Sequence, residues 1–162
     1  MSKTKISIST INYQNKEHQR ILKACFSNWF KNPKVLQFTS PTMSYPFNIN
    51  KWISSYKEKN YKTIIIKIDD WIIGHLSIKE NKEQGSAHLF HLIIAPDYLR
   101  KGYAKKLIFY AEELIMNSNI KKITLNVVKK NIAARQLYFS IGYSDVDNTK
   151  LRNIRMEKYL LD

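Results

Sequence analysis

Hydrophobic positions in the first third of the chain change their spacing twice. Ile6 and Ile8 alternate with polar neighbours, which predicts a short β-strand over residues 5–11. Over residues 15–31 apolar positions recur every three or four residues, the spacing of a helix with one buried face. Prolines and small polar residues predict an irregular loop over 39–50, and 50–59 predicts a second, shorter helix.

The middle of the chain has the spacing of strands. Residues 63–68 and 71–78 flank Asp69-Asp70, which predicts a two-residue hairpin turn. A third strand is predicted over 87–94, after the turn signal Gln84-Gly85. We therefore expect an antiparallel meander of three strands.

The last third alternates helices with strands. A helix is expected over 102–117 and a strand over 123–128, and a connection of this length predicts a right-handed crossover with parallel pairing. A further helix ends near Gly142, and 144–146 with 153–159 are expected to close the sheet as a hairpin.

Length and composition favour one globular domain over residues 1–162, with 44% hydrophobic and 25% charged residues. The single cysteine, Cys25, excludes an intramolecular disulfide and a multi-cysteine zinc site, and its apolar helical setting favours a core position. No apolar run approaches the ~20 residues of a membrane span, so we expect no membrane partner. The single cysteine fits a reducing compartment, so we expect a cytoplasmic protein, and we expect no metal.

The formal net charge of +14 has two interpretations. Clustered cations attract anions such as nucleic acid. However, the lysines are spread over every segment, and no run of five like charges occurs. Solvated surface is therefore the favoured interpretation, and a nucleic-acid partner is not expected.

Residues 93–107 carry the strongest chemical signal. An apolar run stops at Pro96, a polar loop follows, and a helix opens at Gly102 with Ala104 two positions on. First-turn amides and the helix dipole attract anions, and the two small residues permit close approach of a phosphate. Four cations surround this spot: Arg100, Lys101, Lys105 and Lys106.

Two common phosphate motifs do not fit this stretch. The third glycine of a G-x-G-x-x-G fingerprint would fall on Leu107, and the Gly-Lys-Ser/Thr of a Walker loop is absent. An ordinary helix with a basic first turn remains the alternative interpretation.

Two segments resemble motifs of the GNAT superfamily of N-acetyltransferases. Residues 99–104, Leu-Arg-Lys-Gly-Tyr-Ala, resemble motif A, Q/R-x-x-G-x-G/A, except that Leu99 replaces the polar first residue. Residues 131–143 resemble motif B, N-x-x-A-x-x-L-Y-x-x-x-G-F/Y. The resemblance implies an α/β fold of the α+β type, with a mixed, mostly antiparallel sheet flanked by helices.

The resemblance also implies a coenzyme site for acetyl-CoA. The strand before motif A pairs with the pantetheine amides, and a backbone amide near Ile94 meets the thioester oxygen. The residues expected to bind the coenzyme are Leu92, Ile93, Ile94, Leu99, Arg100, Lys101, Gly102, Tyr103, Ala104, Lys105, Asn131 and Tyr138.

Two residues are expected to be catalytic. By resemblance Tyr138 is the acid for the leaving thiolate, since a phenol stays protonated at neutral pH; the alternative is a core tyrosine. Asn131 is either a coenzyme neighbour or a helix N-cap. His88 matches the position of a family base, and strand alternation puts it on the face opposite His91. Deprotonation through water is the alternative.

We therefore expect a monomeric or homodimeric enzyme that acetylates a small-molecule amine or a peptide or protein N-terminus by direct attack in a ternary complex. A basic nucleic-acid-binding module and a non-catalytic coenzyme sensor are the alternatives.

Overall fold

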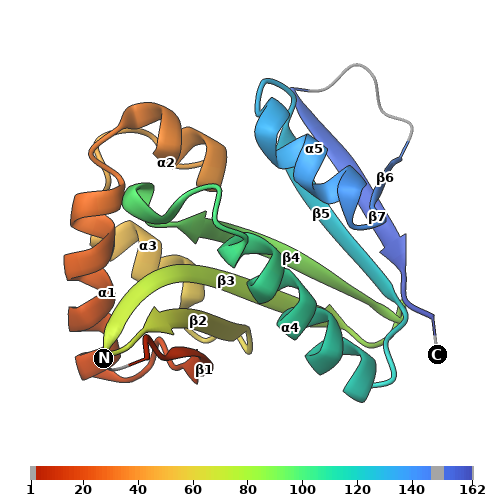
Figure 1. Cartoon of the computed structure of the whole chain (residues 1–162), viewed down its shortest axis with the longest axis horizontal. Coiled ribbons are helices and arrows are strands. Elements are labelled where there is room, and N and C mark those ends of the chain that lie inside the picture. Colours follow the sequence, from red (N-terminus) through yellow and green to blue (C-terminus); the bar gives the residue numbers. More distant parts are fainter. Residues whose placement is uncertain (1–2, 147–151, 162) are drawn as a thin grey trace.

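The computed structural model describes residues 3–146 and 152–161, and in them the chain forms one seven-stranded sheet with five α-helices (Figure 1). The strand order is β1-β2-β3-β4-β5-β7-β6. Among the described strands β4 and β5 pair in parallel and the other neighbours are antiparallel. The strands are β1 Ile6–Ile11, β2 Lys62–Ile68, β3 Trp71–Asn81, β4 Ser86–Ile94, β5 Lys122–Val128, β6 Ser144–Asp145 and β7 Asn153–Tyr159. The expected mixed, mostly antiparallel sheet flanked by helices is confirmed.

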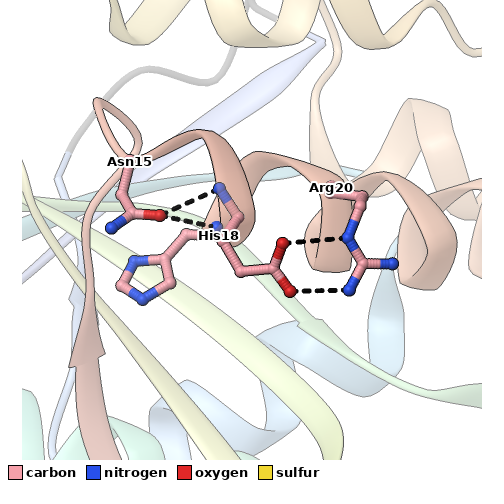
Figure 2. Close-up of polar contacts among 4 residues, drawn as sticks. Asn15, His18 and Arg20 are labelled. Carbon is pink, nitrogen blue, oxygen red and sulfur yellow. Dashed lines mark hydrogen bonds and ion pairs between the residues drawn. The ribbon is translucent and has the colours of Figure 1, made fainter.

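The helices are α1 Lys16–Trp29, α2 Pro33–Thr39, α3 Ile49–Tyr56, α4 Tyr103–Asn117 and α5 Ile132–Ser140. Helix α1 begins where Asn15 accepts hydrogen bonds from the amides of Glu17 and His18, and Arg20 pairs with Glu17 in the next turn (Figure 2). These local contacts set the start of the helix.

Helix α2 was not predicted from the sequence. Asn32 accepts a hydrogen bond from the amide of Lys34 at 2.9 Å, and Pro33 occupies the first helical position. An asparagine cap followed by proline is a helix start signal, so Asn32-Pro33 could have revealed it. The helix buries Leu36 against the rest of the core.

The two faces of the sheet are covered by different helices. Gly74 of β3 lies beneath Leu107 of α4, whereas the next residue, His75, contacts Phe26 of α1 and Trp52 of α3. Because neighbouring strand residues point to opposite faces, α4 covers one face and α1 with α3 the other. Figure 1 shows α4 crossing in front of β3 and β4, with α3 behind.

The sheet opens in its middle. β4 and β5 pair only from Ser86 with Lys122 to Leu89 with Leu125, and Figure 1 shows the two strands diverging beyond that point. The expected parallel pairing is confirmed. Among the described strands, the divergence leaves the second half of β4 without a neighbour on that side.

Strand β4 is not regular. Between the pairs His75–Ile93 and Ser77–Phe90, one residue of β3 faces two of β4, and His91 has a positive φ of +55°. This is a β-bulge. The prediction that His88 and His91 lie on opposite faces was therefore wrong, because the extra residue breaks the alternation.

No helix in the described part of the chain is long and apolar enough to cross a membrane. The predicted closing hairpin is confirmed as β6 paired antiparallel with β7, and its connecting residues 147–151 lie outside the described residues.

Candidate active site

The start of α4 presents backbone amides without an internal partner. Gly102 caps the helix with φ +84°, and Arg100 before it has φ +61°. No side chain caps this end, and within the described residues the amides of Tyr103 and Ala104 donate to no acceptor. These amides and the positive end of the helix dipole form a binding position for an anion.

Space is available directly above this helix start. A Cβ placed on Gly102 would meet no heavy atom within 4 Å, so this glycine is required by its left-handed φ rather than by a close neighbour. Its open side is the one from which a phosphate could approach the amides.

A groove of about 570 Å³ begins at this point and follows β4 and α5. It is lined by Leu92, Ile93, Ile94, Tyr98, Leu99, Arg100, Gly102, Tyr103, Ala104, Lys105, Asn131, Ala133, Ala134 and Leu137. The lining contains every residue expected to bind the coenzyme except Lys101 and Tyr138. Lys101 instead lies over the ring of Tyr98, 5.6 Å from its centre.

A smaller inner cavity of about 90 Å³ lies where β4 and β5 diverge. It is lined by Phe38, Thr39, Leu76, Leu89, Phe90, His91, Leu92, Ile108, Leu125, Asn126, Val127, Asn131, Ala134 and Tyr138. Leu92, Asn131 and Ala134 line both spaces, so the groove adjoins the inner cavity. None of the inner cavity's lining residues carries a formal charge at neutral pH.

Tyr138 projects from α5 into the inner cavity and is 8% exposed. Its hydroxyl makes no hydrogen bond with any described residue. Burial raises the pKa of the phenol above its usual value, so the group remains protonated at neutral pH. A protonated, uncommitted hydroxyl in a cavity can donate a proton to a bound molecule.

Asn131 serves as the N-cap of α5. Its side-chain oxygen accepts a hydrogen bond from the amide of Ala134 at 3.3 Å, and the same residue lines both the groove and the inner cavity. Asn131 can therefore cap α5 and also lie beside a ligand in the groove.

His88 lies in the part of β4 that is still paired with β5. Its Nδ1 is 2.8 Å from the hydroxyl of Thr124, and its side chain lines neither the groove nor the inner cavity. Burial, with Arg155 and Lys79 nearby, lowers the pKa of His88 to about 4, below the ordinary value of 6.5. The imidazole is therefore neutral at physiological pH.

Of the residues that line the inner cavity, only Leu92, Asn131 and Tyr138 were among the site residues expected from the sequence. His91 reaches it because of the bulge, and Phe38 and Thr39 reach it because α2 lies against β4. The Asn32-Pro33 signal could have revealed α2, but no local sequence pattern predicts the bulge in β4. Among the described residues no cluster of three or more His, Cys, Asp or Glu side chains is arranged to hold a metal ion.

The sequence model of the acetyltransferase (GNAT) family matches residues 23–143 of this chain. An uncharacterized N-acetyltransferase of Bacillus subtilis (strain 168), YycN, is 31% identical over 78 residues, which cover 47% of this chain and 50% of that protein. The matched segment thus spans half the length of this curated relative.

Solved structures share the fold at low sequence identity. The PaiA N-acetyltransferase of Thermoplasma acidophilum, in complex with coenzyme A, aligns with a TM-score of 0.70 and 20% identity, over 96% of this chain and 99% of its own. The ribosomal-protein-S18-alanine N-acetyltransferase of Escherichia coli aligns with a TM-score of 0.72 and 17% identity, over 98% and 96%. At such identities these similarities concern the fold alone.

Proposed function

Because the chain belongs to the GNAT family of acetyltransferases, whose sequence model matches residues 23–143, we propose that it transfers an acetyl group from acetyl-CoA to a primary amine. The observation that carries the proposal is the continuity of the site. An uncapped helix start opens into a groove, and the groove adjoins a cavity that holds the uncommitted Tyr138 hydroxyl.

The groove suits an extended, anionic donor. The pyrophosphate is proposed to bind the amides at the start of α4, with Arg100 and Lys105 beside it. The edge of β4 at Leu92, Ile93 and Ile94 is proposed to pair with the pantetheine amides, because no described strand pairs with this half of β4 on the β5 side. Leu99 provides no polar contact, so the backbone and Arg100 must compensate for it.

In the proposed reaction a neutral amine attacks the thioester carbonyl, so that a C–N bond forms and the C–S bond then breaks. An amide near Ile94 stabilises the developing oxyanion. Tyr138 donates its proton to the departing sulfur and regains a proton released by the amine. His88 remains the proposed base; because it lines neither space, it would first take the amine's proton through water and then return it through water to Tyr138.

The acceptor is proposed to be a monoamine or a peptide α-amine rather than a polycation. None of the described residues that line the inner cavity is acidic, so a second ammonium group would find no counter-charge from them there. The formal net charge of +14 also repels polycations at long range. Residues 1–162 are proposed to act as one domain, either as a monomer or as a homodimer.

Ligand-dependent stabilisation followed by an acceptor screen tests this function. Acetyl-CoA should raise the melting temperature, since a ligand at about 100 times its Kd stabilises the folded state by about 2.7 kcal/mol. Single-stranded DNA should not. Stabilisation by DNA alone would refute the proposal in favour of a nucleic-acid-binding protein.

The acceptor screen should detect free coenzyme A thiol with monoamines and short peptides. Bound acetyl-CoA without thiol release on any amine would indicate a sensor instead of an enzyme. Spermidine or an aminoglycoside as the best acceptor would overturn the acceptor class but leave the acetyl transfer intact.

A further inference from the structure

The bulge in β4 lies close to the place where this strand leaves β5. His91 and Leu92 together face the single residue Leu76 of β3, and His91 has φ +55°. Leu92 lines both the groove and the inner cavity. Because a bulge bends its strand and re-aims the residues that follow, the direction of β4 beyond His91 depends on how the bulge is held.

The bulge is held through its main chain by a buried imidazole. Nδ1 of His75 donates to the carbonyl oxygen of His91 at 2.8 Å, and His75 has an exposed fraction of 0%. The ring of His91 has separate contacts, with the hydroxyls of Tyr56 at 2.8 Å and Ser40 at 3.1 Å. The His75 contact therefore concerns the backbone alone.

Trp52, Tyr13 and His75 form a chain of hydrogen bonds in which each donor and acceptor can be assigned. The indole N–H of Trp52 lies 2.7 Å from the Tyr13 hydroxyl, which lies 2.8 Å from Nε2 of His75. An indole nitrogen can only donate and the His91 carbonyl can only accept. Tyr13 must therefore donate to Nε2, and the proton of the neutral imidazole must sit on Nδ1.

The residues of this hydrogen-bond chain come from distant parts of the sequence. Tyr13 precedes α1, Trp52 lies on α3 and His75 on β3, and the indole ring of Trp52 also stacks on the ring of His91 with 4.0 Å between centres. Burial lowers the pKa of His75 to about 4, so the imidazole stays neutral and keeps this pattern at physiological pH.

We propose that the Trp52–Tyr13–His75 chain is a positioning device that holds the β4 bulge, and that His75 thereby orients the backbone of Leu92–Ile94 toward the donor. His75 lines neither the groove nor the inner cavity, so it acts through His91 and not on the substrate. This inference rests on the proposed acetyl transfer. If these groups served only to fill the core, an apolar residue of similar size would replace the imidazole without a specific effect on the site.

Replacement of His75 tests the device. His75→Leu removes the donor to His91 and should lower kcat/KM for acetyl transfer about ten- to a hundredfold, the scale expected from misplacement by a remote residue. His75→Gln keeps a donor and an acceptor and should recover most of that loss. Leu22→Ala is the control, because Leu22 is a fully buried residue of α1 that lines neither space.

Activities are compared at a temperature where all variants are folded, together with their melting temperatures. The control should lose stability and keep kcat/KM. Equal kcat/KM for His75→Leu and Leu22→Ala, or no recovery in His75→Gln, would overturn the proposal.

The imidazole tautomer supplies a readout that does not depend on activity. In nitrogen-15 NMR spectra of the wild-type protein, His75 should show the neutral Nδ1–H form throughout pH 6 to 8. An Nε2–H form, or titration near pH 6.5, would refute the hydrogen-bond chain. A wild-type protein without acetyl transfer would instead refute the proposed function, so the two failures are distinguishable.

Discussion

Replacing Tyr138 by phenylalanine removes one hydroxyl from the inner cavity and changes little else. The hydroxyl makes no hydrogen bond with any described residue, and the ring is 8% exposed. Its loss therefore breaks no internal contact. If Tyr138 is the proposed acid, the substitution should impair turnover and leave the fold intact.

The expected loss in turnover is ten- to several-hundredfold, at or below the usual range for a general acid. This corresponds to about 1.4 to 3.4 kcal/mol of activation free energy. Stability should change little, because the hydroxyl has no hydrogen bond to a described residue that the substitution could break. Coenzyme affinity should be unchanged.

The assay is steady-state thiol release with a saturating amine, alongside acetyl-CoA binding and melting temperature. Tyr143→Phe is the matched control. Tyr143 is 2% exposed, has an unpartnered hydroxyl among the described residues, and packs against Tyr138 with 5.8 Å between ring centres. It lines neither the groove nor the inner cavity, so its variant should turn over like the parent.

A Tyr138→Phe protein with parental turnover would refute the acid assignment. A similar loss in Tyr143→Phe would show that removal of any buried hydroxyl in this region is enough, and the reasoning from the cavity would fail. A melting temperature lowered by several degrees in Tyr138→Phe would mean that the hydroxyl is held by a contact.

Three further changes can be measured. Gly102→Val should abolish acetyl-CoA binding in calorimetry, because the new side chain enters the open space above the helix start. It should also cost about 1 to 2 kcal/mol of stability, because the residue has φ +84°. Retained affinity would place the pyrophosphate elsewhere. If His88 is the base, the pH–rate curve should contain an inflection near pH 4, where the pKa of His88 lies, and His88→Ala should remove that inflection; an unchanged profile would exclude this role. Acid should destabilise the fold between pH 6.5 and 4, because the unfolded chain binds a proton that buried His75, with a pKa of about 4, does not bind. In denaturant titrations this one group should lower the free energy of unfolding by about 3 kcal/mol by pH 4. A free energy of unfolding that is independent of pH in that window would contradict the burial of His75.

Local patterns were sufficient for most elements and for the uncapped start of α4. Helix and strand spacing depends on which residues face inward, and this can be read from a short segment. Gly102 and Ala104 have the same consequence wherever a helix starts, since small residues leave its first amides accessible. The parallel pairing of β4 with β5 followed from the length of the connection that contains α4.

The pairing of distant segments decided the rest. The bulge at His91 depends on how β4 registers with β3 and on a donor from His75, sixteen residues away in the chain. No alternation rule within β4 contains that information, which is why the faces of His88 and His91 were predicted wrongly. The lowered pKa values of His75 and His91 likewise arise from burial under α1 and α3, and burial exists only once the segments have packed. The sequence by itself thus determined most of the elements and the glycine turn before α4, because these are properties of neighbouring residues. Only the tertiary structure decided which side chains meet at the divergence of β4 and β5, because that meeting requires contacts between segments far apart in the chain.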